Sequence, residues 1–179
     1  MVTSVEFQPR TIELRDGSKL LLRPIVPEDE PLLHEALAAM SERSVLFRFY
    51  SPIKRLSDAL AHRLAVVDYS DRFALVAAVR RADGRERIAG VARYDRARGT
   101  EVAEVAVAVI DEYQRRGLGG TLLAELARVA RRHGIMSFTL IVLPENREML
   151  GLLRRLGWIH QARLNGGLYE ISFELPDEA

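Results

Sequence analysis

The sequence has no cysteine among its 179 residues, and this absence removes several classes of protein. Without thiols there is no disulfide framework, no thiolate metal site and no cysteine nucleophile. A charge excess of one sign is missing as well, because 26 Lys and Arg residues balance 25 Asp and Glu residues to a formal net charge of +1. No overall field therefore draws the chain to nucleic acid or to an anionic membrane.

Long apolar runs are also missing. No segment approaches the roughly 20 apolar residues that a membrane helix needs, and the first ten residues, MVTSVEFQPR, lack the apolar core of a signal peptide. We therefore expect a cytoplasmic protein. Internal repeats and low-complexity linkers are absent, and hydrophobic residues make up 48% of the chain, so we expect a single domain over residues 1–179. The four histidines are too scattered to predict a metal site, and the oligomeric state stays open.

The hydrophobic pattern changes its period along the chain. Alternating runs around Asp16-Gly17 predict a β-hairpin, whereas helical spacing follows it and strand-like runs fill the middle third. The predicted order is hairpin, helices, three antiparallel strands, helix, strand, helix and hairpin, over residues 11–25, 28–47 with 57–67, 73–109, 117–132, 136–143, 146–156 and 158–175. This order predicts an α+β fold, with a mixed, mostly antiparallel twisted sheet flanked by helices.

The most informative segment, QRRGLGG, joins the third strand of the middle part to a helix. Gly117, Gly119 and Gly120 are costly at a helix start unless the backbone must approach another group closely. Bare first-turn amides can surround a phosphate, which the helix dipole favours, and Arg115 and Arg116 add positive charge there. The alternative is a glycine-rich turn beside a solvated arginine pair. The glycine spacing excludes a Walker loop and a dinucleotide-binding fingerprint.

This segment resembles the Q/R-x-x-G-x-G/A pyrophosphate loop of the GNAT family of N-acyltransferases. Two further pieces carry the likeness: the strand end Val107-Ala-Val109 before the loop, and an Asn146…Gly157-Trp158 element after it. The resemblance implies the GNAT fold, in which the fourth and fifth strands splay apart around acyl-CoA. It also implies acetyl-CoA as the cosubstrate and no metal.

The resemblance further implies which groups bind acetyl-CoA. The backbone of Val107, Ala108 and Val109 would bond the pantetheine amides as an added strand does. Asn146 would contact the pantetheine arm, although a plain helix N-cap is an equally good reading of this residue. The pyrophosphate would be held by the backbone amides of Arg115, Arg116, Gly117, Leu118, Gly119 and Gly120.

Acyl transfer to an amine also needs a base, because a lysine-type amine with a pKa of about 10.4 is almost fully protonated at pH 7. Glu104 is our candidate, acting directly or through water. It lies three residues before Val107 and interrupts an otherwise apolar run. Strand alternation places it on one face with Ala106 and Ala108, where we expect a half-buried carboxylate. The alternative is a solvated residue on an exposed face of the sheet.

The amino-terminal half adds a narrower likeness. The segments RPIVPEDE, RFY and DYSDRFA resemble the catalytic domain of bacterial Pat-type protein lysine acetyltransferases. This implies a protein lysine as the acceptor, with acyl-CoA synthetases as typical targets. That branch keeps a glutamate at the position of Glu104, and it lacks the tyrosine that many GNAT enzymes use as general acid, which is Leu153 here. We therefore assign no general acid: the thiolate leaves unprotonated, or it is protonated by water or by another phenol, that of Tyr113, Tyr94 or Tyr169.

Two alternatives to protein acetylation stay open at this point. One is the acetylation of a small-molecule amine by the same chemistry. The other is a non-catalytic acyl-CoA-binding module, which would bind the cosubstrate and transfer nothing.

Overall fold

The computed structural model describes residues 7–159 and 161–176. Within that part of the chain, eight strands form one sheet in the order β1-β2-β3-β4-β5-β6-β8-β7. Neighbouring strands are antiparallel except for β5 and β6, which are parallel. The strands are β1 (Arg10–Glu13), β2 (Lys19–Pro24), β3 (Arg72–Arg80), β4 (Glu86–Arg96), β5 (Val102–Val109), β6 (Ser137–Val142), β7 (Gln161–Asn165) and β8 (Leu168–Glu174). The predicted fold class is confirmed.

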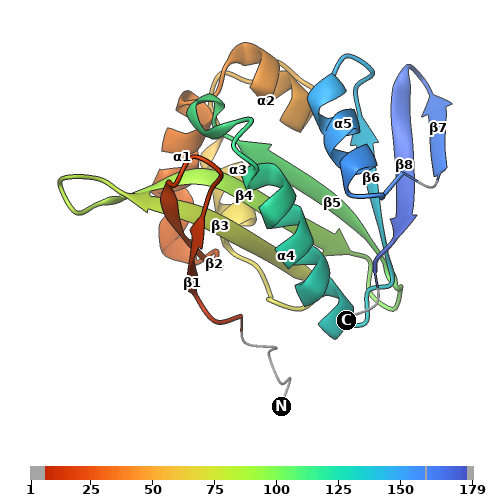
Figure 1. The fold of residues 1–179 in the computed structure, drawn as a ribbon, viewed down its shortest axis with the longest axis horizontal. Helices are drawn as coiled ribbons and strands as arrows, with labels where there is room; N and C mark the ends of the chain where they lie inside the picture. Colours follow the sequence, from red (N-terminus) through yellow and green to blue (C-terminus); the bar gives the residue numbers. More distant parts are fainter. Residues whose placement is uncertain (1–6, 160, 177–179) are drawn as a thin grey trace.

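Helices cover both faces of the sheet, so the fold has three layers (Figure 1). One apolar cluster joins α4 and α5 to one face, and a second cluster joins α1, α2 and α3 to the other. The helices are α1 (Glu30–Ala38), α2 (Glu42–Phe49), α3 (Asp58–Ala65), α4 (Leu118–Arg132) and α5 (Arg147–Arg155), with short 3-10 turns η1 (Pro27–Asp29) and η2 (Asp111–Tyr113).

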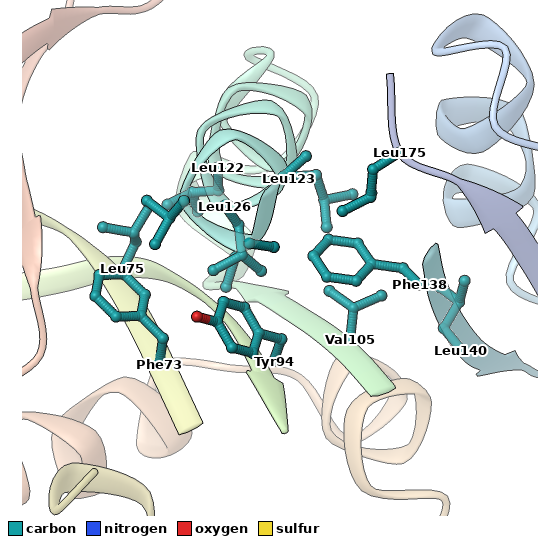
Figure 2. Packing of buried hydrophobic residues seen from close by; sticks show 14 of the residues in the cluster. Phe73, Leu75, Tyr94, Val105, Leu122, Leu123, Leu126, Phe138, Leu140 and Leu175 are labelled. Atoms are coloured by element: carbon teal, nitrogen blue, oxygen red, sulfur yellow. The ribbon is translucent and has the colours of Figure 1, made fainter. Parts of the chain in front are cut away.

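Helix α4 packs on the middle of the sheet with the apolar stripe that its 3.6-residue spacing predicts. Leu122 and Leu126 are fully buried and face Phe73 and Tyr94 of the sheet (Figure 2). The helix comes very close to β4 at Gly90, which has no side chain to hold the two apart. This packing fixes where α4 begins, and therefore where the glycine-rich segment before it lies.

The first hairpin contacts that same segment. Its turn contains Gly17 at φ 82°, a left-handed conformation that glycine adopts without strain. The backbone N–H of Arg15 lies 3.5 Å from the Arg116 carbonyl oxygen, and the Asp16 carboxylate lies 2.8 Å from the Arg116 guanidinium. A hairpin near the amino terminus is thus attached to the loop that opens α4.

Helix α2 begins at a serine cap. Ser41 accepts a hydrogen bond from the backbone N–H of Ser44 at 3.2 Å, as a serine N-cap does. The helix ends at Tyr50, whose backbone is left-handed with φ 55° although it is not a glycine. In Figure 1 the helix lies at the same end of the molecule as α5, and the hydroxyl of Tyr50 reaches the Ile141 carbonyl of β6 at 2.6 Å.

The second hairpin starts later than predicted. We expected a strand from residue 158, but β7 begins at Gln161, because Trp158 is buried and stacks on Phe173 with ring centroids 4.7 Å apart. An aromatic ring of this size contributes more in the core than in an exposed edge strand. No helix in the described part of the chain is long and apolar enough to cross a membrane.

Candidate active site

Strands β5 and β6 run side by side for only three residue pairs. The last pair is Glu104 with Thr139, after which β5 continues beside β4 while β6 continues beside β8. The two strands therefore separate inside the sheet, as the resemblance implied. A cleft of about 300 Å³ lies at this separation.

The cleft collects residues from five parts of the chain. Its walls come from β5, β6, α2, α5 and the glycine-rich segment before α4. Among the residues that the sequence singled out, the cleft is lined by Val107, Ala108, Val109, Arg115, Gly117, Leu118, Gly119, Gly120 and Asn146. Glu104 and Arg116 do not line it.

The backbone of β5 presents alternate hydrogen-bonding groups to the cleft. The N–H of Ile110 donates to the Ala89 carbonyl of β4 at 3.0 Å. Because these groups alternate in direction along a strand, Ala108 also faces β4, whereas Val107 and Val109 face the separation. An extended ligand with amide groups can therefore pair with Val107 and Val109, while Ala108 contributes to the wall of the cleft.

The glycine-rich segment ends in a cluster of backbone donors without acceptors. Gly117 caps α4 with φ 89° and offers no side chain, and the first intrahelical bond runs from the Thr121 N–H to the Gly117 carbonyl at 3.1 Å. The N–H groups of Leu118, Gly119 and Gly120 consequently have no intrahelical acceptor. Open amides at a helix start, next to the positive end of its dipole, fit the diphosphate of a nucleotide cosubstrate.

Gln114 holds this segment against β5 and α2. Its side-chain amide donates to the Val109 carbonyl at 2.9 Å and to the Ser44 hydroxyl at 3.0 Å. The sequence identified Gln114 only as the first letter of a motif, and nothing in its spacing identified Ser44. The structure shows why a glutamine is useful there, since its side chain links three elements at the mouth of the cleft.

Arg116 differs from the expectation that both arginines add charge at the phosphates. Its guanidinium forms an ion pair with Asp16 and lies 5.0 Å from the centre of the Tyr113 ring. Arg115, which has φ 58°, is the arginine that lines the cleft. The side chain of Arg116 therefore positions the loop, and only its backbone belongs to the turn.

Glu104 is exposed rather than half-buried, so the expected burial between alanines is wrong. The side chains that would enclose it belong to β6, which separates from β5 at this residue. Asp95 of β4 lies directly opposite and pairs with Arg72 at 2.8 Å and with Arg93 at 3.5 Å. Within residues 7–159 and 161–176, Glu104 has no hydrogen bond or ion pair of its own, so its carboxylate is available.

Three arginines surround this pair of carboxylates. Arg93 is 5% exposed and donates to the Leu64 carbonyl at 3.1 Å, and burial lowers its pKa to about 10. Burial also lowers the pKa of Arg48, which interacts electrostatically with Asp95 and Glu104. These cations offset the repulsion expected between two carboxylates opposite each other on neighbouring strands.

Asn146 is the N-cap of α5. Its side-chain oxygen accepts a hydrogen bond from the Met149 N–H at 3.1 Å, which leaves its NH₂ group as the donor that can reach into the cleft. The two readings of this residue are therefore compatible. Leu153, on the same helix, is fully buried in the core.

No group of three or more potential ligands that could hold a metal ion occurs among the described residues. The cleft is lined by backbone donors, by aromatic and guanidinium side chains and by the carboxylates of Asp111 and Glu148, and the free carboxylate of Glu104 lies outside its lining. This set can bind an elongated nucleotide thioester and accept a proton from an amine beside it.

Known proteins are similar to this chain in sequence and in fold. Residues 40–158 match the model of the acetyltransferase (GNAT) family. Acetyltransferase PA5475 of Pseudomonas aeruginosa is 35% identical over 148 residues, which are 83% of this chain and 79% of that protein. Acetyltransferase Pat of Mycolicibacterium smegmatis is 32% identical over 86% of this chain, but over only 46% of its own length.

Among solved structures, the GNAT domain of S. lividans PAT superposes with a TM-score of 0.86 at 31% identity, covering 95% of this chain and 100% of that domain. The family match spans well over half of the chain, and it includes the strand separation, the glycine-rich segment and α5. The chain therefore belongs to the acetyltransferase (GNAT) family and is an acetyl-CoA-dependent acetyltransferase.

Proposed function

We propose that this enzyme transfers the acetyl group of acetyl-CoA to a lysine side chain of a protein, by direct attack of the amine with Glu104 as the general base. The observation that carries the proposal is the position of Glu104, a free carboxylate at the point where β5 and β6 part. An acyl-CoA synthetase is the acceptor class that the Pat-type likeness suggests. A cytoplasmic location follows, because acetyl-CoA and such acceptors occur there.

In this proposal the diphosphate lies on the amides from Arg115 to Gly120, and the pantetheine arm pairs with Val107 and Val109 along the open edge of β5. The NH₂ group of Asn146 contacts the arm. The thioester then lies near the point of separation, where a strand amide close to Val107 can stabilise negative charge on its oxygen.

The amine acceptor arrives mostly as an ammonium ion, which the carboxylate of Glu104 attracts, and it must lose one proton to water before the neutral amine can attack and give up its second proton. Asp95 is already neutralised by Arg72 and Arg93, so Glu104 is the carboxylate that can take the proton. A positioned base of this kind contributes roughly 10²–10⁴-fold to a rate.

The exposure of Glu104 supports a protein acceptor over a small amine. A lysine on a folded surface can reach an exposed carboxylate while the rest of its protein stays outside. A small amine would depend on enclosing contacts for its affinity, and Glu104 lies outside the enclosed part of the cleft.

The test uses acetyl-CoA labelled in its acetyl group, cell extract as the source of acceptors, and the wild-type enzyme beside Glu104→Gln. We expect label in protein bands on a gel, and a turnover that falls about tenfold or more in Glu104→Gln with little change in acetyl-CoA affinity. Purified acyl-CoA synthetase is a second acceptor arm.

Glu101→Gln is the matched control, since Glu101 is an exposed glutamate three residues upstream whose side chain is far less well placed. Label found only in small molecules would show that the acceptor is a small amine and not a protein. Acetyl-CoA binding without any transfer would support the non-catalytic module, and an equal loss in both variants would reject Glu104 as the base.

A further inference from the structure

The sulfur that leaves from acetyl-CoA needs a partner, and the position that supplies one in many related enzymes cannot do so here. Leu153 is apolar and 0% exposed. The chain has five tyrosines. Tyr94 is fully buried and its hydroxyl bonds to Ser70 and His133, while the hydroxyl of Tyr69 bonds to the Ile25 carbonyl.

The remaining three tyrosines differ in their distance from the point of separation. Tyr169 lies on β8, on the far side of β6. Tyr113 packs against Arg116 at the glycine-rich end of the cleft. Tyr50, which follows the last residue of α2, also lines the cleft, and its hydroxyl reaches β6.

The phenol of Tyr50 crosses the space between α2 and β6. It donates a hydrogen bond of 2.6 Å to the carbonyl of Ile141, which lies two residues beyond the last β5–β6 pair. Continuing that parallel register would place Ile141 level with Ala106 of β5, between Glu104 and Val107. The phenol is therefore at the height along the cleft where the proposed thioester lies.

Tyr50 is 42% exposed as a whole residue, and its phenol keeps its proton near neutral pH because the ordinary pKa of a tyrosine is about 10. Burial raises the pKa of Tyr50, and the nearby carboxylate of Glu104 raises it further, while Arg48 acts in the opposite direction. Because the phenol keeps its proton across the range in which the enzyme would work, it remains a hydrogen-bond donor. The backbone of Tyr50 has φ 55°, a left-handed conformation that is strained for a residue with a Cβ atom. Contacts of its side chain must therefore hold it there.

We propose that Tyr50 is a further catalytic residue, whose hydroxyl turns from the Ile141 carbonyl to the sulfur of acetyl-CoA and stabilises it by a hydrogen bond as the carbon–sulfur bond breaks. This rests on the proposed direct attack of an amine on acetyl-CoA. The amine nitrogen forms the new bond to the carbonyl carbon, and its proton passes to Glu104. The electron pair of the broken bond goes to sulfur, which takes up a proton from water after release.

The test compares two donors that differ in one atom: acetyl-CoA, and the ester in which selenium replaces sulfur. Selenols are stronger acids than thiols, so a selenium leaving group needs less help from a donor. Enzyme in excess over acetyl-labelled donor is mixed with cell extract, and the rate of label transfer is measured in a single turnover. The acceptor need not be known for this measurement.

Tyr50→Phe removes only the hydroxyl and tolerates the same backbone. We expect its transfer rate from acetyl-CoA to fall about tenfold or more, in line with the loss of one donor at a reacting centre. With the selenium ester the loss shrinks to about threefold or less, and the dissociation constant of acetyl-CoA changes little. Tyr69→Phe is the matched control, because Tyr69 also has a left-handed backbone, at φ 59°, and donates to a backbone carbonyl at 2.9 Å.

An equal loss with both donors would show that Tyr50 acts only by tying α2 to β6, and no loss with acetyl-CoA would show that it does nothing in the reaction. Either result overturns the proposal. Glu104→Gln in the same assay separates the two proposals. If Glu104→Gln transfers label at the wild-type rate while Tyr50→Phe shows the donor-dependent loss, Glu104 is not the base and the role of Tyr50 stands.

Discussion

Gly90 of β4 lies so close to Leu122 of α4 that a Cβ atom at residue 90 would be 2.9 Å from Leu122 Cδ1 and 3.2 Å from the Ala108 carbonyl oxygen. The helix therefore packs directly on bare backbone. A methyl group there forces the Leu122 side chain to move, and if that side chain cannot turn aside, α4 shifts away from β4 together with the open amides of its first turn.

We expect Gly90→Ala to lower the free energy of unfolding by about 1–3 kcal/mol, the usual cost of overpacking a core, measured by urea denaturation. If the clash with Leu122 is the cause, adding Leu122→Ala costs less in the Gly90→Ala background than in the wild type. Strictly additive effects would place the cost at the two other close atoms, the Ala108 carbonyl oxygen and Leu118 Cδ2, each 3.2 Å from the added Cβ.

The proposed binding of the diphosphate by the first-turn amides of α4 can be tested with two side chains that have the same size and differ in charge. A Cβ at Gly119 would lie 3.5 Å from Leu152, an ordinary contact, and the backbone there has no positive φ. We therefore expect Gly119→Gln and Gly119→Glu to fold equally well. Calorimetry should show that Gly119→Glu loses acetyl-CoA binding, because a carboxylate now competes with the diphosphate, while Gly119→Gln keeps more of it. Equal affinities of the two variants for acetyl-CoA would show that the diphosphate does not bind at these amides.

Hydrogen exchange can distinguish ligand contacts at the glycine-rich segment from ligand contacts at β5. Coenzyme A should slow amide exchange at Val107 and Val109, whose N–H groups face the separation, and should change Ala108 less, because Ala108 already faces β4. ADP carries the diphosphate without the pantetheine arm, so it should protect the glycine-rich segment and leave both valines unchanged. Protection of the valines by ADP would contradict strand-like pairing with the arm.

At 100 times its dissociation constant, coenzyme A should also raise the free energy of unfolding by about 2.7 kcal/mol.

His133 makes stability depend on pH. Its Nδ1 lies 2.6 Å from the Tyr94 hydroxyl, and its buried Nε2 has no hydrogen-bond partner in the described part of the chain. Burial, followed by the charges of Arg96 and Arg132, lowers the pKa of His133 below its usual 6.5. The unfolded chain therefore binds this proton more readily than the folded one, so stability is complete above pH 6.5 and is lost as the pH falls through the lower, folded-state pKa.

Thermal unfolding between pH 7 and pH 5 checks this expectation. The melting temperature of the wild type should fall with pH, and His133→Gln should fall less steeply even if its melting temperature is lower throughout. His34→Gln, which removes a half-buried histidine whose Nε2 lies 3.8 Å from Asp58, is the control for the loss of a histidine elsewhere in the fold. Parallel slopes for the wild type and His133→Gln would assign the dependence to other groups.

Much of the fold was predictable because its signals are local. The stripe of Leu122 and Leu126 identifies the buried face of α4, and Ser41 and Ser57 mark the starts of α2 and α3 by capping. Backbone groups of the cleft were predictable for a similar reason, since strand and loop are continuous in sequence.

Side chains from distant segments were not predictable. Tyr50 and Ser44 reach the cleft only because α2 crosses the end of the sheet, which no local spacing reports. Glu104 was expected to be half-buried because alternation gives its face but not whether a neighbouring strand covers it. We expected Arg116 to lie at the phosphates because the sequence does not show its ion-pair partner, Asp16, which lies 100 residues earlier.

The attachment of the first hairpin to the glycine-rich segment has a consequence for variation in this enzyme. An exposed ion pair such as Asp16–Arg116 contributes little to global stability, yet it is one of the contacts that orient the turn ahead of α4. Changes in the amino-terminal arm can therefore retune how tightly the donor is held, without altering any atom that touches it. Affinity is thus adjustable from a hairpin that does not line the cleft.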